Sequence, residues 1–288
     1  MTIRLFVHIP KTAGTSFRLG AEQALGAQSM VYDYGAESPE TSAITQKHVY
    51  QEQDFWGFYG ACYESGAAIV GGHMNCNRFV AGFGVENIVT FVRDPLQRIA
   101  SEYQHFVRVK NYKGTFRDFY SQSRMQNRLS RAFRDVPLYS VGFVGVTERY
   151  NDSLDMLNEL SGLGIPRREE NLGNGGVGRA HSFDEEELRE LKAFNREDLA
   201  LYRRCLDLFD QRWELFKKGQ PFVHGVLTQV AANRVGGWAW WAGTSDEPVA
   251  VDIAVNGQPQ GRVVARDFAA HLCRLSPPRG GMSAFICR

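Results

Sequence analysis

Residues 3–18 read IRLFVHIPKTAGTSFR, and this stretch constrains the fold more than any other. A run of β-branched and aromatic residues stops at a proline, crosses a small loop with glycine and hydroxyl side chains, and continues into helix-compatible residues. This order is typical of phosphate-binding loops, in which free N–H groups at the helix start bind an anion. The Walker A pattern puts its lysine after the second glycine, whereas Lys11 precedes Gly14. The sequence therefore predicts an anion-binding loop unlike that of NTPases.

Further along the chain, short apolar runs alternate with helical patterns. The runs at 67–72, 87–93 and 141–146 are typical of strands buried on both faces of a parallel sheet. Helical spacing follows the loop over 16–25, and two later helices are expected to stop at Gly162 and to break near Asn195. The fold class predicted is α/β, a P-loop-type, mainly parallel sheet flanked by helices.

The residue pattern changes after Pro221. GGWAWWAG is followed by alternating runs around Asn256-Gly257, a pair that indicates a β-hairpin. We expect domains at 1–218 and 219–288, the second a small C-terminal β-module whose thin core leans on the first. Its tryptophans are expected to form that core, although stacking on sugar rings is an alternative.

Composition excludes several classes of protein. The formal net charge is only +1, which argues against a nucleic-acid-binding protein. Five scattered cysteines fit a reducing compartment better than a disulfide framework. The first strand begins near Ile3, which leaves no room for a signal peptide, and no apolar run is long enough for a membrane span. We therefore expect a soluble, cytoplasmic protein, whose oligomeric state the sequence does not indicate.

A second motif, FVRDPLQRIASEY at 91–103, places Arg93 at the end of a predicted buried strand. Asp94 and Pro95 form a helix start, with Asp as the N-cap and Pro at the first helical position. Ser101 follows about two turns into that helix. Ligands of open parallel sheets bind at the carboxyl ends of strands, so Lys11 and Arg93 are expected along one crevice.

Together, HIPKTAGTSF and FVRDPLQRIASEY resemble the two nucleotide-binding motifs of sulfotransferases that use 3′-phosphoadenosine-5′-phosphosulfate (PAPS). The resemblance is to the carbohydrate O-sulfotransferase branch, which includes heparan sulfate 2-O-sulfotransferase. GVTERYNDSLDML and NREDLALYRRCLDLF also look like that branch. The resemblance covers roughly residues 3–216 and does not reach the β-module.

The resemblance implies roles for particular residues. The 5′-phosphosulfate would be held by Lys11, Thr12, Ala13, Gly14, Thr15 and Ser16, and the 3′-phosphate by Arg93 and Ser101. It also places the catalytic base at His73 and a carbohydrate or glycoconjugate as acceptor. A lysine and aimed N–H groups suit the charge that develops on the leaving phosphate, so Lys11 is the expected charge stabiliser and no metal is implied.

Other candidates are weaker. The loop after residue 166 departs from the family pattern, with Asn171, Asn174 and Arg179 as its polar candidates in a Gly-rich stretch, 171–178, that we expect to be mobile. Glu148 either faces the crevice or pairs with neighbours of Arg149. His8 and His105 are expected to be structural, as is His48, which is a weak acceptor-site candidate. His73 and Cys76 alone make a poor metal site. Four further basic residues would suit an anionic acceptor, although as a solvated surface they need no such role. They are Arg78, Arg108, Lys110 and Lys113.

Two alternative functions remain open at this point. A P-loop kinase using ATP is disfavoured by the position of Lys11 and by the lack of an evident Mg²⁺-binding carboxylate. A non-catalytic glycan-binding protein would need a decayed α/β domain, which the intact Lys11, His73, Arg93 and Ser101 disfavour. The identity of the acceptor cannot be read from this sequence.

Overall fold

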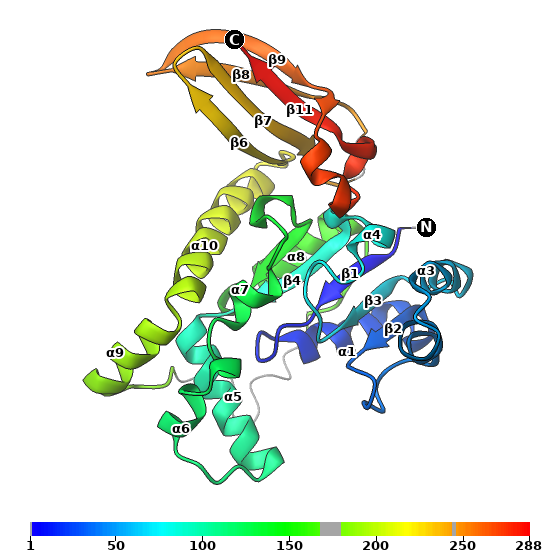
Figure 1. Ribbon diagram of the computed structural model, residues 1–288, viewed down its shortest axis with the longest axis vertical. Coiled ribbons are helices and arrows are strands. Elements are labelled where there is room, and N and C mark those ends of the chain that lie inside the picture. The colour runs from blue at the N-terminus through cyan, green and yellow to red at the C-terminus, as the bar shows by residue number, and fades with distance from the viewer. Residues whose placement is uncertain (1, 168–179, 244–245) are drawn as a thin grey trace.

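The computed structural model describes residues 2–167, 180–243 and 246–288. A five-stranded parallel sheet forms the centre of the larger part, with the strand order β2-β3-β1-β4-β5. Its strands are β1 (Arg4–Val7), β2 (Met30–Asp33), β3 (Ile69–Gly72), β4 (Ile88–Val92) and β5 (Phe143–Val146). This all-parallel sheet, flanked by helices, confirms the predicted fold class (Figure 1).

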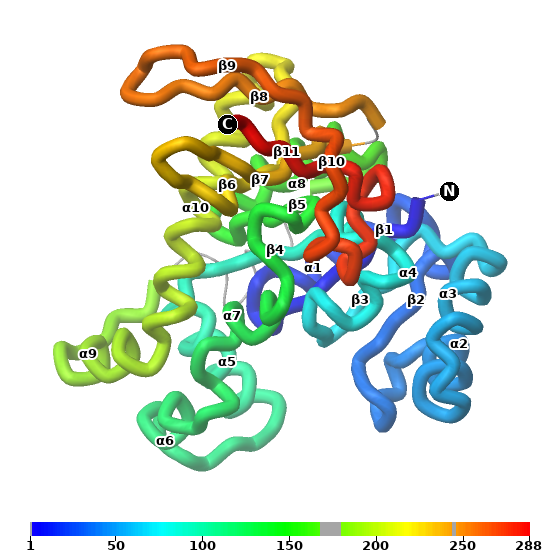
Figure 2. Tube along the Cα trace, turned by 45° about the horizontal axis from the view of Figure 1, so that its top comes forward, coloured from blue at the N-terminus to red at the C-terminus, as the bar shows by residue number. Residues whose placement is uncertain are grey.

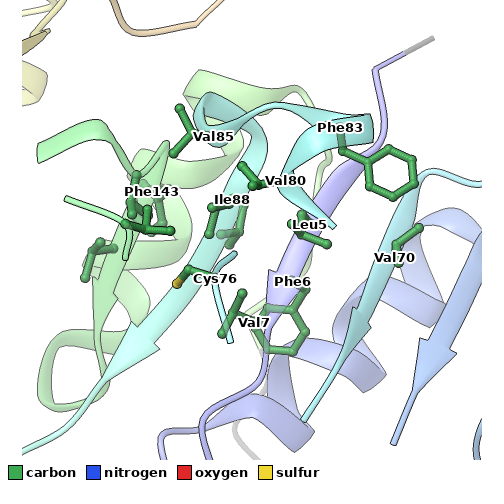
Figure 3. Packing of buried hydrophobic residues seen from close by; sticks show 14 of the residues in the cluster. Leu5, Phe6, Val7, Val70, Cys76, Val80, Phe83, Val85, Ile88 and Phe143 are labelled. Carbon is green, nitrogen blue, oxygen red and sulfur yellow. The ribbon is translucent and has the colours of Figure 1, made fainter. Parts of the chain in front are cut away.

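Apolar side chains fill both faces of the sheet. Leu5 of β1 lies between Ile88 of β4 and Val70 of β3, and helix α4 packs nearby (Figure 3). On the other face, the Phe6 ring centroid lies 4.3 Å from that of Phe17 in α1. Alternation along β1 explains this, because neighbouring residues of a strand point to opposite faces.

Helices connect and cover the strands. They are α1 (Gly14–Leu25), α2 (Ala43–Thr45), α3 (Phe55–Glu64), α4 (Val80–Phe83), α5 (Pro95–Lys110), α6 (Phe116–Tyr120), α7 (Arg128–Ala132), α8 (Tyr150–Ser161), α9 (Glu185–Phe194) and α10 (Arg196–Lys217). Shorter turns of helix join them, including the π-helix η2 (Gln46–Gln51) between α2 and α3. No helix in the described ranges is long and apolar enough to cross a membrane.

Several local predictions are confirmed. The Asp94 carboxylate accepts hydrogen bonds from the N–H groups of Leu96 and Gln97, which caps α5 as expected. Gly162 ends α8 in the left-handed conformation, with φ 67°. Asn195 separates α9 from α10. All five cysteines are free.

The C-terminal strands form antiparallel sheets of their own. They are β6 (Val223–Ala231), β7 (Arg234–Trp241), β8 (Val249–Val255), β9 (Gln258–Ala265), β10 (Asp267–Phe268) and β11 (Met282–Cys287). One sheet has the order β10-β11-β7-β6, and β8 pairs with β9. The predicted hairpin is confirmed, since Asn256 and Gly257 both have positive φ and join two paired strands.

This β-module shares its core with the parallel-sheet part. Trp238 and Trp240 are 2% and 1% exposed, and both belong to the same buried cluster as the strands of the large sheet. The tryptophans are therefore core residues, as expected. His224 of β6 lies 3.1 Å, through Nδ1, from the carbonyl oxygen of Tyr139, just before β5. The module thus covers the amino ends of the strands, and in both views it lies opposite α5, α6 and α9 (Figures 1 and 2).

Candidate active site

The loop between β1 and α1 has an unusual backbone. Lys11 and Ala13 have φ values of 67° and 65°, whereas Thr12 between them does not have positive φ. Such alternation turns successive N–H groups toward one concave side, a nest that binds anions. The Thr12 hydroxyl donates to the Ile9 carbonyl at 2.8 Å and braces the turn. No side chain caps the start of α1, and no acidic residue lies in its first turn, so the positive end of the helix faces the loop.

Gly14 lies directly against its neighbour His8. A Cβ atom built at Gly14 would lie 2.0 Å from Cδ2 and 2.2 Å from Nε2 of His8. Any side chain at this position would force the His8 ring to move, because real Cβ atoms do not approach other atoms this closely. Gly14, the first residue of α1, therefore packs directly on the His8 imidazole.

Two cations lie beside the loop. The Arg93 guanidinium, just past β4, reaches the Lys11 carbonyl at 3.4 Å. Burial lowers the pKa of Lys11, and the charges of Arg108 and Arg93 lower it further. Within the described ranges neither Lys11 nor Arg93 forms an ion pair with a carboxylate. Carboxylates act on both cations only through longer-range charge, from Glu102 on Lys11 and from Glu148 and Asp94 on Arg93. Neighbouring cations without direct carboxylate partners suit an anionic ligand.

Ser101 lies on α5, the helix that begins just after Arg93. It is half-buried, and its hydroxyl makes no hydrogen bond to the part of the chain that the structure describes. Thr15, in the first turn of α1, is exposed. Ser16 is buried beneath it.

His73 follows β3 at the same edge of the sheet. Its ring centroid lies 4.7 Å from that of His8 and 4.9 Å from that of Tyr34. The His73 side chain is exposed to solvent, although these two rings and the surrounding chain crowd it enough to desolvate the charged form. This desolvation lowers the pKa of His73 below its ordinary value, and the nearby charge of Arg128 lowers it further. The neutral imidazole, which can accept a proton, is favoured.

No known protein family and no curated protein matches the chain. A solved structure, the crystal structure of a sulfotransferase from Alicyclobacillus acidocaldarius, is similar at 14% sequence identity with a TM-score of 0.41. The match covers 74% of this chain and 99% of that chain. A similarity this low carries no argument here. The fold class rests on the sheet order, and the function rests on the side chains of the site.

Two cavities meet at His73. One, of about 310 Å³, is bordered by His8, Pro10 and His73 and by three arginines, two on α7 and one just after it. These are Arg128, Arg131 and Arg134. The other, of about 520 Å³, extends toward β2 and α3 and is lined by aromatic and amide side chains, among them Tyr34, Tyr50, Phe55, Asn75 and Asn77. His73, Met74 and Asn75 border both. A bound molecule could therefore reach His73 from either side.

The weaker sequence candidates have varied surroundings. Arg78 lines the larger cavity, but its Nε donates to buried Asp33 at 2.6 Å, which leaves little net charge for an anionic acceptor. Glu148 accepts from the Asp94 N–H at 2.9 Å, so it faces the site edge and also holds the helix start. His48 lies 2.9 Å from the Glu52 carboxylate and lines neither cavity.

A possible metal-binding cluster lies elsewhere. Among the described residues, three potential ligands gather at His48, Glu52 and Asp54. Asp54 already caps α3 by accepting from the Gly57 N–H. Cys76 is fully buried and lies outside this cluster. The Gly-rich segment 171–178, with Asn171, Asn174 and Arg179, lies outside the described residues.

The sequence reasoning missed parts of the site. The strand β2 was not expected, although Val31 and Tyr32 at its centre are β-formers. His8 was expected to be structural, yet it lies between Gly14 and His73. Its place directly after β1 was the available signal, because strand carboxyl ends carry ligand-binding groups. The three arginines of the smaller cavity were not singled out either.

A buried ion pair supports this edge of the sheet. The guanidinium of Arg98 is fully buried and bonds the Glu102 carboxylate one turn further along α5. Arg128 approaches the other Glu102 oxygen at 4.0 Å. Glu102 therefore balances two arginines, one of which borders the smaller cavity.

We expect Glu102→Ala to destabilise the protein by about 3–5 kcal/mol, because it leaves Arg98 buried without a counterion. Urea denaturation measures this loss. The control is the double variant Arg98→Met, Glu102→Met, which removes both charges and should lose clearly less. A loss below about 1 kcal/mol for Glu102→Ala would show that water reaches Arg98.

Proposed function

We propose that this chain is a PAPS-dependent sulfotransferase that transfers a sulfuryl group to a hydroxyl of a carbohydrate or glycoconjugate. The observation that carries the proposal is the start of α1, with Lys11 and Arg93 beside it and the neutral imidazole of His73 at the same edge of the sheet. Neither cation pairs with a carboxylate among the described residues, and two cations suit a nucleotide with phosphates at both its 5′ and 3′ ends. The resemblance of both sequence motifs supports the same reading.

The residues present fit such a donor. The loop 11–16 would hold the 5′-phosphosulfate through its N–H groups and the Lys11 ammonium, while Arg93 and the unpartnered hydroxyl of Ser101 would hold the 3′-phosphate. When bound, PAPS supplies the sulfuryl group to be transferred. No metal is needed in this proposal, because Lys11 and the helix start supply positive charge where the leaving phosphate gains negative charge.

His73 would act as the general base. Its neutral ring takes the proton of the acceptor hydroxyl while the acceptor oxygen bonds to sulfur and the bond from sulfur to the 5′-phosphate oxygen breaks. The products are a sulfate ester and adenosine 3′,5′-bisphosphate. The two cavities at His73 provide room for an acceptor, and the aromatic lining of the larger one suits a sugar ring.

Thermal unfolding with added nucleotides tests the proposal. We expect adenosine 3′,5′-bisphosphate to raise the melting temperature, since a ligand at a hundredfold excess over its Kd adds about 2.7 kcal/mol of stability. ATP with Mg²⁺ should add little, because it lacks the 3′-phosphate that Arg93 would bind. The opposite ranking would favour a P-loop kinase instead.

A further inference from the structure

His8 is wedged between the loop and the proposed base. Its backbone N–H donates to the Gly72 carbonyl at 2.9 Å, which fixes the residue at the end of β1. Its ring faces Gly14 on one edge and the His73 ring at 4.7 Å. The ring also borders the smaller cavity, so His8 lies between the loop and the space proposed for the acceptor.

One hydrogen bond bears on the tautomer of His8. Its Nδ1 lies 3.2 Å from the Tyr34 hydroxyl, which can donate to it. When Tyr34 donates and Nδ1 accepts, the ring proton of His8 lies on Nε2. This tautomer is taken as part of the proposal.

The Nε2 atom of His8 lies beside the start of α1. A Cβ at Gly14 would lie 2.2 Å from Nε2, so this nitrogen lies beside the first residue of the helix. Nε2 has no hydrogen-bond partner in the portions of the chain that are described. An N–H group that lacks a partner, at a helix start and on a cavity wall, is suited to bind an anionic oxygen.

We propose that His8 is a substrate-binding residue that donates a hydrogen bond from Nε2 to an oxygen of the sulfuryl group undergoing transfer. The inference rests on the proposed function and adds to it a contact that discriminates PAPS from its product. His8 acts as a neutral donor: burial and the nearby His73, Arg18 and Lys11 lower its pKa to about 3. It therefore does not compete with His73 for a proton at neutral pH.

The tautomer is measured directly by ¹⁵N NMR of protein labelled at histidine. We expect the His8 signals of the Nε2–H form in the wild-type protein, and a mixture of both tautomers in Tyr34→Phe, which lacks the donor to Nδ1. A wild-type protein with its His8 proton on Nδ1 would overturn the inference. This measurement requires neither an acceptor nor a change at His8.

Nucleotide binding tests the contact itself. His8→Phe keeps a flat ring against Gly14 but removes the N–H donor. Isothermal titration should show PAPS binding weakened by about tenfold, as for loss of a hydrogen bond to a charged group, and binding of adenosine 3′,5′-bisphosphate changed less than twofold. His8→Gln retains an N–H donor and should recover part of the PAPS affinity. The matched control is His105→Phe, a histidine on α5 that borders neither cavity.

The outcomes separate the two proposals. Equal losses for both nucleotides in His8→Phe would mean that His8 only shapes the loop, and an unchanged PAPS affinity would exclude the contact. Either result overturns the inference while leaving the proposed function intact. If the wild-type protein bound neither nucleotide, the proposed function would fail and the inference would fail with it.

Discussion

Replacing His73 by alanine is expected to lower turnover by about 10²-fold or more while nucleotide affinity stays nearly constant. The loss is the usual contribution of a general base. Nucleotide affinity should persist because Lys11 and Arg93 remain in place. Transfer of radiolabelled sulfuryl groups to a panel of polysaccharides and glycolipids measures turnover, and titration with adenosine 3′,5′-bisphosphate measures affinity.

The pH dependence gives a second measure of the same group. His73 acts as a base only when neutral, and its pKa lies below the ordinary value of 6.5. Wild-type turnover should therefore stay constant as the pH is lowered to 6.5. It should fall only when the pH passes below the lowered pKa of His73. If His73→Ala kept wild-type turnover on an acceptor that the wild-type protein sulfates, His73 would be excluded as the base and Glu148, at the site edge, would be tested next.

Lys11→Ala is expected to have the other large effect. Removing the ammonium group takes away positive charge that stabilises the negative charge developing on the leaving phosphate in the transition state. Losses of about 10²- to 10³-fold in turnover are typical for such groups. Affinity for the bisphosphate product should also fall, since Lys11 would contact its 5′-phosphate. Both quantities are measured with the same transfer and titration assays.

Arg93→Ala is the matched control, because it removes a neighbouring cation assigned to the 3′-phosphate. A lost charge-assisted contact of about 1.5–3 kcal/mol weakens nucleotide binding by at least tenfold. With saturating PAPS, however, turnover should recover more fully than in Lys11→Ala. Identical behaviour of the two variants would show that both cations serve binding alone.

Local sequence patterns predicted the fold well where a short motif favours a single local structure. Asp94 before Pro95 can cap a helix, and Asn256-Gly257 can form a two-residue hairpin turn, and both do so. The apolar runs became the buried strands β3, β4 and β5 for the same reason. β2 was missed because its residues MVYD end in a charged residue and form no continuous apolar run of the kind that marks β3, β4 and β5.

The surroundings of the site depend on contacts between distant residues. Nothing near His8 in the sequence indicates Tyr34 or His73, yet both side chains lie against its ring. The pairing of Arg78 with Asp33, across a gap of 45 positions, likewise removed a candidate cation. The roles of the loop residues, Arg93 and Ser101 were suggested by motif and remain predictions that the variants above address.

The tryptophan pair of the β-module has an evolutionary consequence. Trp238 and Trp240 are buried against the parallel-sheet part, at the amino ends of its strands. A gene fusion that moved residues 219–288 to another protein would expose both indoles unless the surface beneath them moved too. The module is therefore expected to be inherited with its host. Loops at the carboxyl edge are free of this constraint and can diversify toward new acceptors without disturbing it.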